Sequence, residues 1–136
     1  MRLVRILLAI YFIFNYLPHF GQYQPVYRHL TVDEGLSASE VYHVLQDSKG
    51  YIWFATNNGV SRFDGYNFEN FDLVSGLADN TVFEIYEDYK QRVWFIPFSG
   101  NLSYFENGKI KSYPYNSKIK QHFPNSRGPI KMAFYV

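Results

Sequence analysis

The sequence of 136 residues contains no cysteine. This absence excludes a disulfide scaffold, a thiolate metal site and a lipid-anchored cysteine. The sequence also has little charge of either sign in excess, because 13 Lys and Arg face 12 Asp and Glu for a net charge of +1. No basic cluster indicates a surface that follows a phosphate backbone, so we expect no nucleic-acid partner.

Amphipathic helical stretches are also missing after residue 25, where Gly and Asn interrupt the apolar pattern repeatedly. Helical repeats are therefore excluded as the architecture. Aromatic residues, in contrast, are abundant, with 13 Tyr, 13 Phe and 2 Trp making up 21% of the chain. Aromatic side chains suit the pleated surface of a sheet and are scarce in disordered chains. The composition predicts an ordered, β-rich protein.

The first 22 residues have the pattern of an export signal. Arg2 and Arg5 precede an apolar run over residues 6–14, which is followed by turn-forming residues. Such a run is shorter than the roughly 20 apolar residues of a membrane span. We predict a signal peptide or N-terminal anchor over residues 1–22, cleaved or uncleaved, and a periplasmic or other extracytoplasmic location. A buried helix is the alternative. Contact with a membrane is expected only through this segment, if it stays uncleaved.

Residues 35–75 and 76–116 are two copies of one repeat. Gly35 recurs as Gly76 and Trp53 as Trp94 at an offset of 41, and after Asn101 the offset becomes 42. A fixed period of this length is typical of solenoids, propellers and arrays.

Each copy is divided into short strands by turn residues. In the first copy the predicted strands cover residues 41–46, 51–56, 60–63 and 67–72, with turns at 47–50, at 57–59 and at Asp64-Gly65. Four short antiparallel strands in about 40 residues describe one propeller blade. The predicted fold class is all-β: a β-propeller fragment of two four-stranded antiparallel blades, with a lone outer strand before them, after an N-terminal signal helix.

The second copy departs from the first at two structural positions. Gln91 stands where Gly50 gives the turn its freedom, and Pro97 replaces Thr56 at the end of the second strand. If the turn needs a positive φ, Gln91 costs about 1 kcal/mol. Proline removes a ladder donor and suits an edge or a bulge.

The first copy resembles the two-component regulator propeller repeat. The residues that carry the resemblance are Gly35-Leu36-Ser37, Val41, Gln46-Asp47, Gly50, Ile52-Trp53, Thr56, Gly59, Phe63-Asp64-Gly65 and Phe68. The resemblance implies the extracytoplasmic sensor region of a hybrid two-component histidine kinase, a region associated with sensing glycans or other nutrients. In the family a membrane helix and a kinase core follow the propellers. This sequence shows neither, so we expect the chain itself to be no enzyme, and dimerisation only in the full-length relative.

The internal repeat sets the predicted boundaries. Tyr27 and Leu30 align with Phe68 and Phe71, so residues 23–34 read as a lone outer strand of an incomplete blade. Residues 35–75 and 76–116 are the two blades, and residues 117–136 read as the truncated start of a third repeat, with an opening strand at 129–136. We therefore expect an N-terminal fragment of a propeller that behaves poorly alone, because its apolar faces and strand edges would be exposed.

No catalytic or metal-binding residue is predicted, no cofactor is expected, and the ligand-binding residues are unknown from sequence. Asp47 and Asp88 are interpreted as turn residues, Trp53 and Trp94 as packing residues between blades rather than sugar platforms, and His43 as a strand residue. Glu84, Glu87 and Asp88 are interpreted as a solvated acidic edge. Any ligand is expected at loops on one end of the blades, such as the loop with Asn57 and Asn58 and its counterpart with Phe98 and Ser99.

Three functions stay open at this point. The first is a ligand-sensing region, with an extracellular carbohydrate or other small ligand as partner. The second is part of a propeller enzyme, a lyase or glycosidase, which would need an acidic or histidine cluster from further blades. The third is an inactive structural or partner-docking remnant.

Overall fold

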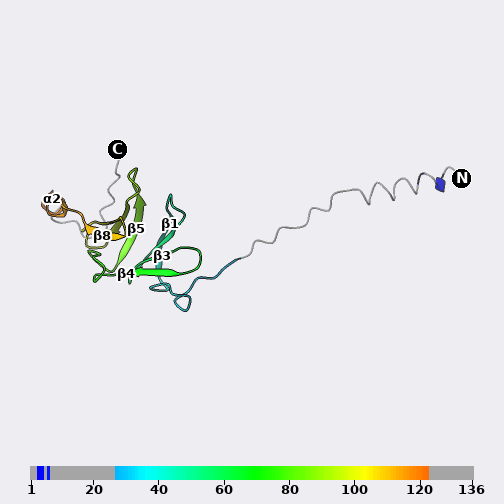
Figure 1. The fold of residues 1–136 in the computed structure, drawn as a ribbon, viewed down its shortest axis with the longest axis horizontal. Coiled ribbons are helices and arrows are strands. Elements are labelled where there is room, and N and C mark those ends of the chain that lie inside the picture. Colours follow the sequence, from blue (N-terminus) through cyan, green and yellow to red (C-terminus); the bar gives the residue numbers. More distant parts are fainter. Residues whose placement is uncertain (1–2, 5, 7–26, 123–136) are drawn as a thin grey trace.

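The computed structural model describes residues 3, 4, 6 and 27–122 as two four-stranded antiparallel sheets and a short helix (Figure 1). The first sheet contains β1 (Val41–Gln46), β2 (Ile52–Thr56), β3 (Gly59–Phe63) and β4 (Phe68–Phe71) in that order. The second contains β5 (Val82–Glu87), β6 (Val93–Pro97), β7 (Ser103–Glu106) and β8 (Lys109–Ser112). The prediction of an all-β fold with two antiparallel blades is confirmed, and strand limits differ from it by one residue.

Most of the predicted signal segment and the predicted opening strand at 129–136 lie outside the described residues. Residues 27–30 belong to neither sheet. Instead, the guanidinium of Arg28 lies 5.1 Å from the centre of the Phe63 ring, and its Nη1 donates to the carbonyl oxygen of Gly65 at 3.0 Å. That this segment is the outer strand of another blade stays a prediction, since the strands it would pair with are not among the described residues.

Both sheets contain the same irregularity where the first strand meets the second. The register shifts between Val41 and His43 in one sheet and between Val82 and Glu84 in the other. Pro97 pairs with Val82 beside the second shift, in the position that Thr56 takes opposite Val41. A bulge leaves a residue outside the regular ladder, which is the setting that tolerates a proline.

The turns between the first two strands of each sheet also have the same shape. Gly50 has a φ of 89° and Gln91 a φ of 59°. The amide of each donates to the carbonyl of the turn's aspartate, Asp47 at 3.0 Å and Asp88 at 2.9 Å. Gln91 therefore occupies a left-handed conformation that a side chain makes unfavourable, as predicted.

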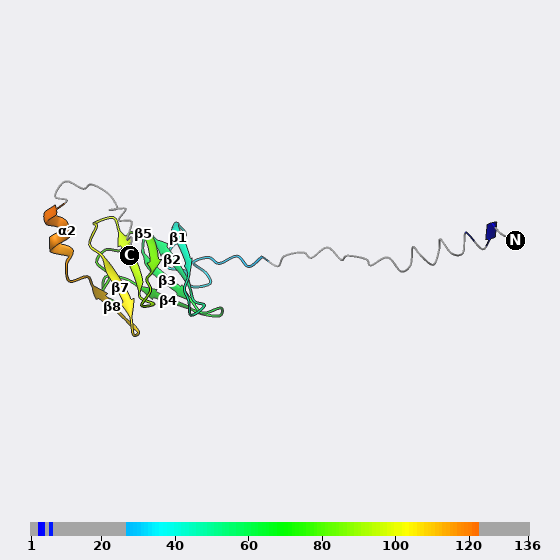
Figure 2. The same ribbon diagram turned by 90° about the horizontal axis from the view of Figure 1, so that it is seen from above.

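The two sheets pack face to face through Trp53, whose side chain is fully buried. Its ring lies 5.8 Å from Phe71 in its own sheet, and 5.6 Å and 5.1 Å from Phe95 and Phe105 in the other. Strands β1 and β5 lie side by side at the junction (Figure 2). Burial of such a ring contributes several kcal/mol and aligns the two sheets as neighbouring blades.

Hydrogen bonds between the sheets fix their relative position. The Glu87 carboxylate accepts from the amide and the hydroxyl of Ser48, at 2.8 and 2.6 Å. The amide of Ile85 donates to Nδ1 of His43 at 3.3 Å.

A helix that the sequence did not predict follows the second sheet. Helix α2 (Asn116–His122) begins where the Asn116 side chain bonds both the amide and the carbonyl of Leu102, each at 2.8 Å. Ile119 packs against the apolar cluster around Trp94. A helix of seven residues is marginal alone, so this packing explains why it forms here and why periodicity could not reveal it. No helix in the described part of the chain is long and apolar enough to cross a membrane.

Candidate functional site

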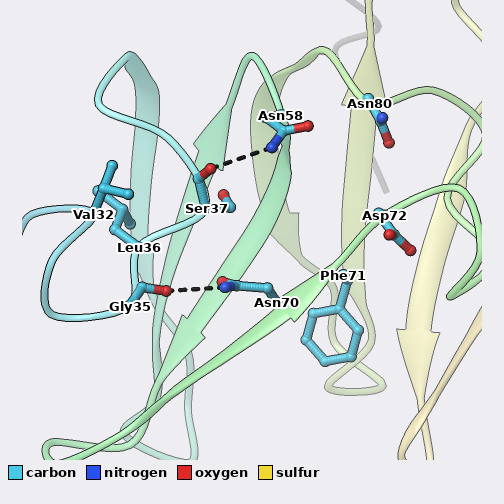
Figure 3. Close-up of a pocket in the computed structure, with 9 residues that line it drawn as sticks. All are labelled: Val32, Gly35, Leu36, Ser37, Asn58, Asn70, Phe71, Asp72 and Asn80. Atoms are coloured by element: carbon cyan, nitrogen blue, oxygen red, sulfur yellow. Dashed lines mark hydrogen bonds between the residues drawn. The ribbon is translucent and has the colours of Figure 1, made fainter.

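A pocket of about 340 Å³ opens at one end of the first sheet, where the chain enters the sheet and where it leaves toward the second (Figure 3). We call this the pocket end. It carries the loops around residues 31–40, 57–58, 72–81 and 98–102, and the opposite end carries the turns after Asp47, Asp64 and Asp88. The pocket is lined by Val32, Gly35, Leu36, Ser37, Asn58, Asn70, Phe71, Asp72 and Asn80.

Ser61 holds the wall of the pocket together from inside the sheet. Its buried hydroxyl lies 2.6 Å from Oδ1 of Asn70 and accepts from the amide of Ser37 at 2.9 Å. The Ser37 hydroxyl in turn lies 3.0 Å from Oγ1 of Thr56. Neutral groups that satisfy one another inside a sheet fix the geometry of what they line.

Two asparagines fasten the entering loop to the sheet. Nδ2 of Asn70 donates to the carbonyl of Gly35 at 2.9 Å, and Nδ2 of Asn58 donates to the carbonyl of Ser37 at 3.3 Å (Figure 3). Because these bonds cross from β4 and from the β2–β3 hairpin to one loop, the three segments form a single preformed wall.

The opposite wall comes from the connection to the second sheet. The backbone carbonyl of Asn80 accepts from the amide of Gly59 at 2.6 Å. The side-chain Oδ1 of Asn80 accepts from the amide of Leu73 at 3.1 Å. Asp72 accepts from the amide and hydroxyl of Ser75, both at 3.0 Å. These bonds hold the pKa of the Asp72 carboxyl below its ordinary value, so the pocket carries one negative charge at neutral pH.

The lining combines amides, a hydroxyl and one carboxylate with the apolar side chains of Leu36, Phe71 and Val32. A concave site with a few fixed polar groups on an apolar floor suits a small hydroxylated or amide-bearing ligand. Among residues 27–122, no three acidic or histidine side chains gather to hold a metal ion.

Comparison with known proteins identifies the repeat. The sequence model of the family described as "Two component regulator propeller" matches residues 35–58. Residues 35–58 are therefore similar to a two-component regulator propeller repeat.

Two individual proteins agree with this match. Over 44 residues the chain is 39% identical to histidine kinase P4 of Formosa agariphila, an alignment that covers 32% of this chain and 3% of the kinase. The fold is similar to the crystal structure of the extracellular domain of a hybrid two-component system from B. thetaiotaomicron, with a TM-score of 0.58 and 29% identity. That match covers 67% of this chain and 14% of the other. The chain thus spans a small part of the length of both proteins.

The propeller repeat supplies much of the pocket. Gly35, Leu36, Ser37 and Asn58 lie inside the matched stretch and line the pocket. Of the four loop residues that sequence placed near a ligand, Asn58 lines the pocket, whereas Asn57, Phe98 and Ser99 lie at the same end outside it.

The aspartates and tryptophans of the repeat prove to be one structural unit. Asp47 accepts from the amides of Lys49 and Tyr51 at 3.0 and 2.9 Å, and from Nε1 of Trp53 at 2.8 Å. Asp88 and Trp94 form the same 2.8 Å bond in the second copy. The turn interpretation of both aspartates is therefore confirmed, and so is packing between the blades for Trp53. Trp94 instead packs within its own sheet and against helix α2. The bond that joins each turn to its tryptophan was not predicted.

The predicted acidic edge separates into different roles. Glu87 binds Ser48 of the first sheet, Asp88 binds Trp94 and pairs with Arg92 at 2.6 Å, and Glu84 is exposed. His43 lies between the sheets as an acceptor for Ile85, as a strand residue can.

Sequence reasoning missed Ser61, Asn70 and Asn80. A usable signal was present, because Ser37 is replaced by the apolar Ala78 in the second copy and Asn70 by the shorter Ser112. Side chains that only one copy has are not required by the fold and so indicate a local role.

Proposed function

We propose that the chain is part of the extracytoplasmic ligand-sensing propeller region of a two-component signalling system. The observation that carries the proposal is that residues 35–58, which match the propeller repeat, also form one wall of the pocket. The similarity to an extracellular domain of a hybrid two-component system supports the location. The matches to the kinase and to the extracellular domain cover only 3% and 14% of those proteins. This supports a role for the chain as one part of a longer sensor.

The ligand we propose is a small extracellular nutrient, a saccharide or a similarly hydroxylated compound. Fixed amide and hydroxyl groups pair with hydroxyls, and Asp72 can accept from them. The role is binding, with no catalytic step assigned to the chain.

Signalling would follow from the position of the pocket, which lies where the first sheet connects to the second. Asn58 and Asn70 belong to the first sheet, and Asn80 precedes the first strand of the second. A ligand held by both walls favours the arrangement of sheets that brings those walls together, and so shifts the population of states that the rest of the sensor reads.

The location is tested by fusing alkaline phosphatase after Val136, since that enzyme needs disulfides that form only outside the cytoplasm. We expect activity from the fusion with residues 1–22 and none without them. Activity that is absent in both would overturn the proposed location.

The sensing role is tested in the gene that encodes the chain, with Asn70→Ala as the variant. We expect the ligand-induced transcripts of the host to lose their induction, while Asn67→Ala, outside the pocket, keeps it. Unchanged induction by Asn70→Ala would contradict a sensing role for this pocket.

A further inference from the structure

The dipeptide Asn-Gly occurs twice in the sequence, each time in a hairpin turn. Asn58-Gly59 lies where β2 turns into β3 at the pocket end, and Asn107-Gly108 joins β7 to β8 at the opposite end. Because glycine has no side chain, its backbone nitrogen can approach the side-chain carbonyl of the asparagine before it. The same two residues therefore have the same intrinsic chemistry at both places, and only their surroundings differ.

Asn58-Gly59 is held in place on both residues. The Gly59 amide donates to the carbonyl of Asn80 at 2.6 Å, and Nδ2 of Asn58 donates to the carbonyl of Ser37 at 3.3 Å. A Cβ built on Gly59 would lie 2.2 Å from the carbonyl oxygen of Phe71, so the backbone is also closely packed. The nitrogen of Gly59 can turn toward the Asn58 side chain only after these contacts break.

Asn107-Gly108 has none of these restraints. Both residues are exposed, and among residues 27–122 neither the Asn107 side chain nor the Gly108 amide has a hydrogen-bond partner. No atom lies within 4 Å of a Cβ built on Gly108. Asn107 also has a φ of 52°, a left-handed conformation that a side chain makes unfavourable. This turn is free to bring the nitrogen of Gly108 to Cγ of Asn107.

We propose that Asn107 is a site of spontaneous deamidation and that the fold protects Asn58 from the same reaction. The nitrogen of Gly108 loses its proton to base and forms a bond with Cγ of Asn107. The Cγ–Nδ2 bond then breaks, and Nδ2 leaves as ammonia. Water opens the resulting cyclic imide at one of its two carbonyls and gives aspartate or isoaspartate. The reaction consumes one water, releases one ammonia and needs no oxidant, metal or cofactor.

The modification changes the charge and the backbone of one hairpin. The new carboxylate lies next in the turn to Lys109, and isoaspartate adds a methylene to the main chain between the paired residues Glu106 and Lys109. Because a two-residue turn sets the register of its strands, a longer main chain weakens the pairing of β7 with β8. Phe105 on β7 packs against Trp53, so the change reaches the junction between the sheets. This inference goes beyond the proposed sensing function and does not rest on it.

The test is peptide mapping by mass spectrometry after incubation of the full chain in mildly alkaline buffer. We expect conversion at Asn107 to be about tenfold faster than at Asn58, because the Gly59 amide must first lose its hydrogen bond. Isoaspartyl methyltransferase with labelled S-adenosylmethionine should label the peptide that contains residue 107. Gly108→Ala should slow the conversion, since the added methyl group hinders the attacking nitrogen. The matched control is Gly65→Ala, in the corresponding hairpin of the first sheet, where φ is also positive and no atom lies within 4 Å of the added Cβ. This variant should leave the conversion of Asn107 unchanged.

A second incubation in guanidinium chloride separates the effect of the fold from that of the sequence. Both dipeptides lose their surroundings there, so their rates of conversion should become similar. Equal rates in the folded chain, faster conversion at Asn58, or no conversion at Asn107 would overturn the proposal. A tenfold difference that persists in guanidinium chloride would also overturn it, because the residue after glycine, Val60 or Lys109, would then be the cause. The phosphatase fusion and the transcript measurement test the sensing function separately.

Discussion

The two blades have the same strand order and the same register shift but different interiors, and the difference shows what the repeat requires. In the first blade Ser61 is bonded to Ser37 and Asn70. In the second its counterpart Ser103 is buried and, within the described residues, its hydroxyl has no partner. Ala78 and Ser112 stand where the partners would be. The shared parts, the Asp–Trp bond and the bulge, build a blade, whereas the polar network is an addition that gives the first blade its pocket.

Position also separates the blades. Val44 and Ile85 are equivalent in sequence, yet Val44 is 51% exposed and Ile85 only 2%. Ile85 faces the first sheet, and Val44 faces no described element. The repeat therefore prepares both faces of each sheet for a neighbour, and burial depends on whether a neighbour is present.

The largest expected effect concerns the two tryptophans. Trp53→Ala should lower the free energy of unfolding by about 3–5 kcal/mol, because it empties the junction between the sheets. Trp94→Ala should cost less, since Trp94 is covered by its own sheet and by the short helix α2. Urea unfolding followed by far-UV circular dichroism measures both. Equal losses would show that the junction between the sheets is no more important than the outer cluster.

The second effect concerns the two buried serines. Ser61→Ala should cost about 1–3 kcal/mol, because it leaves the amide of Ser37 and Oδ1 of Asn70 without a partner. Ser103→Ala should instead raise the free energy of unfolding by about 1 kcal/mol, since it removes an unpaired hydroxyl. The same urea titration applies. A destabilised Ser103→Ala variant would mean that the second blade has a polar network as well.

A third pair of variants exchanges the turn residues. Gln91→Gly should stabilise the chain by about 1 kcal/mol and Gly50→Gln should destabilise it by a similar amount, because both positions have a positive φ. No atom lies within 4 Å of a Cβ built on Gly50, so the conformation alone sets the cost. Thermal unfolding would detect both shifts. Changes of the same sign in the two variants would refute the equivalence of the turns.

The smallest effect is a pH dependence in the second blade. Burial raises the pKa of Asp88, but hydrogen bonds from Trp94 and Arg92 outweigh it, and the net pKa is lowered. A lowered pKa gives stability that is present above the unfolded value and lost as the pH falls through the folded value. Asp88→Asn should therefore be less stable than the unchanged chain at neutral pH, and the gap should narrow below about pH 4. A gap that stays constant down to the acid limit would contradict this.

The sequence predicted the blades well because its signals were local and occurred twice. Turn residues and alternating strands located the four strands of the first blade within a residue, and the offset between copies predicted the same scheme in the second. Contacts between distant residues were beyond it: Ser61 meets Ser37 across 24 positions, and Glu87 meets Ser48 across 39. Helix α2 is stabilised by the packing of Ile119 against the cluster around Trp94. No local sequence pattern reveals that contact. For the pocket, the sequence predicted only that a ligand would bind at loops on one end of the blades, and of the loop residues named for this, Asn58 lines the pocket.

The decisive measurement is amide-resolved NMR of the full chain during titration with maltohexaose, cellohexaose and laminarihexaose. Binding as proposed predicts shifts in the side-chain amides of Asn58, Asn70 and Asn80, all at the pocket end. The turns after Asp47, Asp64 and Asp88, at the other end, should not move. Shifts confined to those turns, or none with any of the three sugars, would contradict a saccharide site at the pocket end.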